Sequence, residues 1–207
     1  IRTLARQIAG DEENPYLIAQ KFFLWIIDNI HYGHEDTETG EIGCTLQADS
    51  KFVYENRRGH CSDWHGFFIS LCRSVGIPAR LTYGFEPSEK KRLSPSHCRA
   101  DVFLAGYGWV NMDITHGRKG KTEAERLQEF GSISNDWYRA TTGTDYPFVP
   151  ATSAPWPGSV TGTNPPLIRM AYIEVDGKAW PDPDPANPKY RDHLEELNYR
   201  LLWDFKE

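Results

Sequence analysis

Several features that would point to a particular class of protein are missing from this sequence. No apolar run approaches the length of about 18 residues that a membrane-spanning helix needs, so no membrane span is predicted. Acidic residues outnumber basic ones, 29 to 23, and no basic stripe is visible, which argues against a nucleic-acid partner. The four cysteines contain no CxxC pair, the spacing of many zinc sites, and no internal repeat is present.

The length of the chain bounds its domain organisation. A chain of 207 residues can bury one sizeable core, and we predict a single domain over residues 1–207. Its core is expected over residues 14–150, with a loop, a strand and a helix added by residues 151–207. The sequence begins with Ile1 rather than Met and has no signal peptide, so we expect it to come from a longer protein. Nothing in it indicates a compartment.

The most informative segment is GHCSDWHGFFISLCRSVGIPAR, residues 59–80. Its apolar residues recur with the 3.6-residue period of an amphipathic helix, and Gly76 followed by Pro78 is typical of a helix end. Cys61 stands in the first turn of this helix, where unpaired N–H groups and the positive end of the helix dipole lower the pKa of a thiol. The pattern therefore leaves two interpretations of Cys61, a reactive thiol or one of the many small, buried and inert cysteines, whereas Cys72, on the apolar face, is predicted to be an inert core residue.

Residues 97–115 predict an antiparallel hairpin, because two alternating runs flank the turn residues 105–108. One face of each run is apolar. Side chains alternate between faces with period two, so the register has to bring the two apolar faces to the same side. The predicted pairs are Leu104 with Gly108, Phe103 with Trp109, Val102 with Val110, and Ala100 with Met112.

This register places His97 and Asp113 together on the opposite face of the hairpin, either directly across from each other or diagonally. Side chains at such positions have Cβ atoms about 5 to 8 Å apart, which lets a carboxylate reach an imidazole. An imidazole held by a carboxylate is the base that a thiol nucleophile needs. Arg99 lies on the same face and offers another interpretation, in which Asp113 pairs with Arg99 and His97 is an ordinary polar residue.

These segments together resemble the transglutaminase-like superfamily, the circularly rearranged relatives of papain-type thiol enzymes. The matching strings are RSVGIPARLTYGF, SHCRADVFL and GYGWVNMDIT, and the likeness covers residues 14 to about 150. The resemblance implies an α+β, papain-like cysteine proteinase fold. In that fold N-terminal helices, with the nucleophile at the start of one of them, pack on an antiparallel sheet; here we expect a C-terminal helix in addition.

The resemblance also assigns roles to residues. It implies Cys61 as the nucleophile, His97 as the general base and acid, and Asp113 as the carboxylate that orients the imidazole. One position departs from the family pattern, because the residue two after the histidine is usually tryptophan and here is Arg99. An aspartate drawn to that arginine would hold the imidazole less firmly. Many members of the family carry a β-rich domain upstream, and one is a possible missing partner here.

The implied chemistry is acyl transfer on a peptide or protein amide, with no cofactor and no metal ion. Cys61 attacks the carbonyl, His97 passes the proton to the leaving amine, and water or an amine resolves the thioester. We favour hydrolysis, by a protease, amidase or deamidase. The alternatives are true protein-glutamine transglutamination and a binding module of weak activity. The backbone N–H of Cys61 is one expected oxyanion donor; the second is Gln47, Trp64 or Trp25.

Other uses of the same residue types stay open at this point. Zinc could be held by a set of four side chains, Cys61, His65, His97 and Cys98. A disulfide between Cys44 and Cys98 is conceivable. The acidic run HEDTETGE, residues 34–41, lacks the ligand spacing of an EF-hand, and we interpret it as a solvated turn.

The remaining elements are predicted from local signals. A helix over residues 1–9 should end at Gly10, and the next should begin at Pro15 with Asn14 as its cap. The expected buried residues of this second helix are Phe22, Trp25, Ile26 and Ile30. Further elements are expected by range: strands near 79–85 and within 127–143, a loop over 147–166 whose Trp156 could border a substrate groove, a strand within 167–177, and an amphipathic helix over 189–205.

Overall fold

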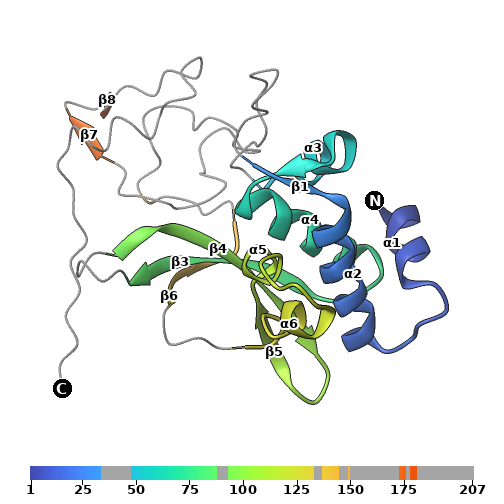
Figure 1. The fold of residues 1–207 in the computed structure, drawn as a ribbon. Coiled ribbons are helices and arrows are strands. Elements are labelled where there is room, and N and C mark those ends of the chain that lie inside the picture. Colours follow the sequence, from blue (N-terminus) through green and yellow to red (C-terminus); the bar gives the residue numbers. More distant parts are fainter. Residues whose placement is uncertain are drawn as a thin grey trace, which may run out of the picture.

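The computed structural model describes residues 1–33, 48–87, 93–132, 137–144 and 149, and the backbone of residues 173–175 and 178–180. Within these residues, helices cover one side of a four-stranded antiparallel sheet (Figure 1), so the α+β architecture is confirmed. Among the residues described, no helix combines the length and the apolar character needed to cross a membrane. The predicted 147–166 loop, the acidic run and the C-terminal helix fall outside the described residues, apart from position 149.

The first two helices form where their local signals place them. Helix α1 (Arg2–Ala9) ends at Gly10, whose φ of 61° is a left-handed conformation that favours glycine. Helix α2 (Pro15–Asn29) begins behind Asn14, whose side-chain oxygen accepts a hydrogen bond from Tyr16 N at 3.0 Å. The expected buried residues of α2 are confirmed except for Trp25, which is only half-buried.

Helix α4 (Cys61–Ser74) lies at the centre of the fold. It contacts the sheet strands on one side and helices α1, α2 and α3 (Ser50–Asn56) on the others. Every residue from Cys61 to Ile69 is buried, polar side chains included. The predicted helix and its buried apolar face are confirmed. What the sequence did not indicate is that polar residues of the first turns are buried as well, where α3, capped by Asp49, packs against α4.

The sheet has the strand order β5-β4-β3-β6, with neighbouring strands antiparallel. The bounds are β3 Ala79–Pro87, β4 Leu93–Leu104, β5 Gly108–Met112 and β6 Tyr138–Thr142. The hairpin β4–β5 has the predicted register, from Leu104↔Gly108 to Ala100↔Met112. Apolar side chains of β4 face the helices, where Ala100 and Val102 are fully buried. Strand β6 lies within residues 127–143, so the prediction that this segment contributes a strand is confirmed.

The second strand of the hairpin is shorter than predicted. It ends at Met112 rather than 115, because Asp113 caps a short helix, α5 (Ile114–Gly117), by accepting a hydrogen bond from His116 N at 3.0 Å. Helix α6 (Glu123–Leu127) follows. Strands β1 (His31–Tyr32) and β2 (Arg58–Gly59) form a parallel pair that brings the end of α2 next to the start of α4. Strands β7 (Ile173–Val175), within the predicted 167–177 strand, and β8 (Lys178–Trp180) pair with each other.

Candidate active site

Three elements meet at the N-terminal end of α4. This helix contributes Cys61 as its first residue, β4 contributes His97, and the end of the hairpin contributes Asp113. His97 Nε2 lies 2.7 Å from Asp113 Oδ2, a hydrogen bond between residues that are diagonal in the register. His97 and Cys61 interact as well, since each changes the pKa of the other. The structure thus brings together all three residues that the sequence singles out.

The surroundings of Cys61 favour its thiolate form. The largest cause is a hydrogen bond from Cys98, the residue after His97 on β4. Burial opposes ionisation, but the imidazoles of His60 and His97 add to the effect of Cys98, and together they hold the pKa of Cys61 well below that of an ordinary thiol. Cys72, in the core of the same helix, behaves in the opposite way, because burial raises the pKa of its thiol.

His97 is arranged to carry a proton. Burial by itself would lower the pKa of His97, but the hydrogen bond to Asp113 and the contact with Cys61 outweigh it and raise this pKa to about 10. Burial would likewise raise the pKa of Asp113, yet the hydrogen bond from His97 and the charge on His97 hold it below the usual range of a carboxyl. The shifts of Cys61 and His97 therefore favour a thiolate beside an imidazolium, with Asp113 as a carboxylate.

The carboxylate of Asp113 is fixed by more than one partner. Its Oδ1 accepts hydrogen bonds from Thr115 Oγ1 at 2.8 Å and from His116 N at 3.0 Å. Its Oδ2 lies 3.3 Å from Arg99 Nε, and the Arg99 side chain in turn lies against the ring of Trp137. The two interpretations of the hairpin are thus compatible, because Asp113 pairs with Arg99 and still binds His97 at the shorter distance.

A second imidazole contacts the thiol. His60 Nδ1 lies 3.3 Å from Cys61 Sγ, and His60 Nε2 lies 2.9 Å from the hydroxyl of Tyr32. Tyr32 belongs to β1, and the β1–β2 pair positions it beside the start of α4. Neither residue stood out in the sequence. The sequence does show that His60 directly precedes Cys61. The contact of His60 with Tyr32, however, depends on the pairing of β1 with β2, two strands of only two residues each.

His65 ties the backbone of the nucleophile to the segment that carries Asp113. Its Nδ1–H donates to Cys61 O at 2.7 Å, and its Nε2 accepts from Ile114 N at 3.1 Å. Both ring nitrogens are therefore used, and no lone pair is left for a metal ion, which speaks against the zinc set with His65 considered above. Burial lowers the pKa of His65 to about 4, so the ring is neutral at pH 7.

We expect the stability of the protein to fall in mild acid because of His65. Its pKa is about 4 in the folded state against an ordinary 6.5, so between these values the unfolded chain binds more protons and folding weakens as the pH falls. The difference corresponds to about 3 kcal/mol. Urea unfolding across this range should show the slope. His65→Asn should flatten it, whereas replacement of the exposed His31 should leave it unchanged; equal slopes in all three proteins would contradict the assignment.

One group of described residues could hold a metal ion: His97, Asp113 and His116. The ring of His116 stacks on that of His97, with centroids 5.1 Å apart and planes at 17°, and its Nδ1 lies 3.3 Å from Asp113 Oδ2. In the sequence, His116 follows Asp113 by three residues, a spacing that makes two side chains neighbours on the surface of a helix.

The structure describes only some of the expected oxyanion donors and of the other cysteines. Gln47 and Cys44 lie outside the described residues. Trp64 is fully buried, and its Nε1 has no hydrogen-bond partner within the described part of the chain, so it is an indole N–H near the nucleophile that could serve as a donor. Trp25 lies on α2 against Phe67 and Arg57. Cys98 is buried as a thiol next to Cys61.

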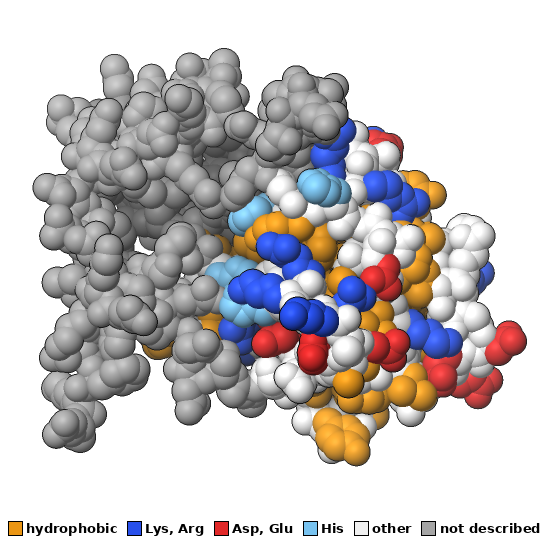
Figure 2. Space-filling model, in the orientation of Figure 1, with side chains coloured by type: hydrophobic (Ala, Val, Ile, Leu, Met, Phe, Trp, Pro, Cys, Tyr) orange, Lys and Arg blue, Asp and Glu red, His pale blue; other side chains and the backbone are white. Residues whose placement is uncertain are grey.

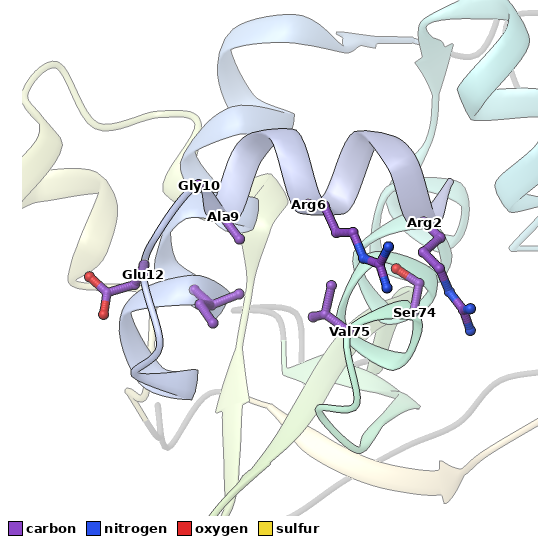
Figure 3. A pocket seen from close by; sticks show the side chains of 8 residues that line it. Arg2, Arg6, Ala9, Gly10, Glu12, Ser74 and Val75 are labelled. Carbon is purple, nitrogen blue, oxygen red and sulfur yellow. The ribbon is translucent and has the colours of Figure 1, made fainter.

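On the face shown in Figure 2, histidine side chains reach the surface beside a group of Lys and Arg side chains. A separate pocket of about 460 Å³ lies at the other end of α4, between Ser74 and Val75 and the arginines of α1, Arg2 and Arg6 (Figure 3). A helix rises 1.5 Å per residue, so this pocket is roughly 20 Å from Cys61 and is not the reaction site.

Comparison with known proteins gives the family. The sequence model of the transglutaminase-like superfamily matches residues 2–114. An uncharacterized protein of Haemophilus influenzae is 23% identical over 92% of this chain and 57% of its own length. The uncharacterized protein YebA of Bacillus subtilis is 23% identical over 56% of this chain and 17% of its own length. The chain thus spans only part of each of these relatives.

Solved structures give weaker likenesses. A candidate cysteine protease from Cytophaga hutchinsonii matches with a TM-score of 0.44 and 23% identity, over 68% of this chain and 48% of that chain. A candidate protease from Parabacteroides distasonis matches with a TM-score of 0.40 and 11% identity, over 53% of this chain and 22% of that chain.

Proposed function

Because this chain belongs to the transglutaminase-like superfamily, we propose that it is a thiol enzyme that transfers acyl groups from peptide or side-chain amides. Cys61 is the nucleophile, His97 the general acid and base, and Asp113 the carboxylate that orients His97. One observation carries the proposal: the 2.7 Å hydrogen bond between His97 Nε2 and Asp113 Oδ2. This bond uses Nε2, and it leaves Nδ1 of the same ring for the thiol.

The first half of the reaction forms a thioester. The Cys61 thiolate attacks the amide carbonyl carbon, and the carbonyl oxygen becomes an oxyanion. The tetrahedral intermediate collapses when the C–N bond breaks, and the amine leaves with the proton that the His97 imidazolium supplies. The raised pKa of His97, about 10, and the lowered pKa of Cys61 keep the proton on the imidazole before the attack. No separate step is then needed to activate the thiol.

The second half regenerates the enzyme. His97, now neutral, takes a proton from water as the water oxygen attacks the thioester carbon. The C–S bond breaks, an acid product leaves, and Cys61 is again a thiolate beside a protonated His97. The backbone N–H of Cys61 belongs to the first helical turn, where it has no partner within the helix, and in this proposal it stabilises the oxyanion in both halves. The buried Trp64 Nε1, which has no partner among the described residues, is the second donor in this proposal.

Acyl trapping with p-nitrophenyl acetate tests the proposal without knowledge of the natural substrate. The wild-type protein should release a burst of p-nitrophenolate and carry an acetyl group on the peptide that contains Cys61. Cys61→Ala should lose both, and Cys72→Ala, a change of the other cysteine of α4, should keep both. Acetylation that spreads over lysines and persists in Cys61→Ala would contradict a thiol nucleophile.

A mixed peptide and amine library then identifies the acceptor. We expect water to resolve the acyl-enzyme, so that the peptides are cleaved or deamidated and no amine is incorporated. Incorporation of a fluorescent primary amine into glutamine peptides would instead assign transglutamination. Mass analysis of the adduct trapped on Cys61 names the acyl donor in either case.

A further inference from the structure

His116 lies in the candidate active site, although acyl transfer does not require it. Its ring stacks on His97, and its Nδ1 points at the same carboxylate oxygen, Asp113 Oδ2, that binds His97. Two imidazoles therefore converge on one carboxylate. The three possible ligand atoms all lie within 4.8 Å of one another.

We propose that His97, Asp113 and His116 form a zinc-binding site, and that zinc bound there inhibits the enzyme. Zinc in proteins takes nitrogen and oxygen ligands at about 2.0 to 2.2 Å in a tetrahedral arrangement, so its ligand atoms are spaced about 3.3 Å apart. His116 Nδ1 and Asp113 Oδ2 already have a spacing of 3.3 Å. His97 Nε2, at 2.7 Å from Asp113 Oδ2, has to move outwards by about half an ångström to admit the ion.

The protein holds these ligands in place with further contacts. Asp113 Oδ1 is bound by Thr115 Oγ1 and by His116 N, which leaves Oδ2 directed at the two rings. Hydrogen bonds of this kind to the ligating side chains are what orient them in metal sites. The ring of His116 is about a quarter exposed and that of His97 about an eighth, so the site is reached from solvent.

The ligand chemistry selects the metal. Two imidazoles with one carboxylate suit zinc and its transition-metal neighbours, whereas calcium and magnesium prefer oxygen ligands alone. The guanidinium of Arg99, 3.3 Å from Asp113 Oδ2, adds a positive charge that opposes a dication. The site therefore fits reversible binding of zinc as an inhibitor better than permanent retention of zinc as a cofactor.

Inhibition follows because zinc binds Nε2 of His97, the nitrogen that forms the hydrogen bond to Asp113. Zinc takes the place of the proton on His97 Nε2, and that proton is released to solvent. The hydrogen bond that orients the imidazole is lost, and a dication next to the ring disfavours the proton that Nδ1 has to give to the leaving amine. This second part of the inference rests on the proposed function. The binding of zinc does not, because Cys61 is not among the three ligands.

Calorimetric titration of zinc chloride into the full chain, freed of metal and carrying Cys61→Ala, tests the binding alone. We expect one zinc per chain, and a dissociation constant more than about a hundredfold higher when His116→Ala is added, because a ligand is lost. Adding His31→Ala instead, a change of an exposed histidine outside the cluster, should leave the affinity unchanged. Calcium chloride in excess should not compete.

The outcomes separate the two proposals. Zinc that binds with the same affinity with and without His116 is held elsewhere, for example by cysteines, and overturns the inference, as does a protein that binds no zinc. With the wild-type protein, zinc should slow the p-nitrophenolate burst, and His116→Ala should need far more zinc for the same effect. Zinc binding that depends on His116 in a protein without acyl transfer would support the metal site while rejecting the enzymatic function.

Discussion

Iodoacetamide at about pH 6 should alkylate Cys61 roughly a hundredfold faster than Cys72. An ordinary thiol with a pKa near about 8.5 is ionised to well below 1% at this pH, and only the thiolate reacts. The contacts of Cys61 with Cys98, His60 and His97 hold its pKa far below that value, whereas burial raises the pKa of Cys72. The lower intrinsic nucleophilicity of a low-pKa thiolate reduces the ratio but does not reverse it.

The pH profile of this alkylation gives the sharper test, since it does not depend on how accessible the sulfur is. The rate at Cys61, followed by mass analysis of its peptide, should stay level from about pH 6 to pH 9, because the thiolate is already formed. His97→Ala should move the rise of the profile to higher pH, and Cys72→Ala should leave it in place. A rate at Cys61 that climbs tenfold per pH unit up to about 8.5 would rule out an activated thiol.

Asp113→Asn should lower the turnover of p-nitrophenyl acetate by about 10⁴-fold with little change in KM, as loss of the orienting carboxylate does in comparable triads. An asparagine cannot hold the Nε2–H of His97 as a carboxylate does, and it presents an amide donor that favours the wrong tautomer. Loss of the anion also removes the interaction that raises the pKa of His97 to about 10. The alkaline limit of activity should therefore move to lower pH.

Asp101→Asn is the matched control for this change. Asp101 is also a fully buried aspartate of the hairpin, and it pairs with Arg80 at 2.9 Å and with Arg139 at 3.0 Å, away from His97. Both variants should lose stability in thermal unfolding, because each replaces a buried carboxylate that pairs with cationic side chains. Only Asp113→Asn should lose turnover. Equal losses of turnover in the two variants would show that Asp113 acts through stability alone.

Local signals were sufficient for much of the fold. The caps at Asn14, Gly10 and Gly76 act within a few residues of the chain, so the helix ends that they mark could be placed without tertiary information. The β4–β5 register also follows from the sequence, because side chains alternate with period two and a slip by one residue would turn the apolar face away from the core.

Local signals gave wrong or incomplete predictions where tertiary packing determines the end of an element or the burial of a side chain. Strand β5 ends early because Asp113 caps α5, and a carboxylate that caps a helix looks in the sequence like any other strand residue. The burial of the first nine residues of α4, polar ones included, depends in part on α3, a short helix that packs against it. Polar residues of α4 such as Asp63 and His65 are buried because they bind backbone groups of other segments.

What the sequence by itself determined is therefore that Cys61 begins a helix and that the hairpin register brings His97 and Asp113 together, while the roles proposed for these three side chains come from the family resemblance. These placements depend on helix start signals and on strand alternation, both of which act over short distances along the chain. Only the tertiary structure decided what surrounds these side chains: His60 with Tyr32 beside the thiol, His65 between two backbones, and His116 stacked on His97. The physical reason is that a pKa and a possible metal site depend on distances of a few ångströms between segments far apart in the chain, and packing alone sets those distances.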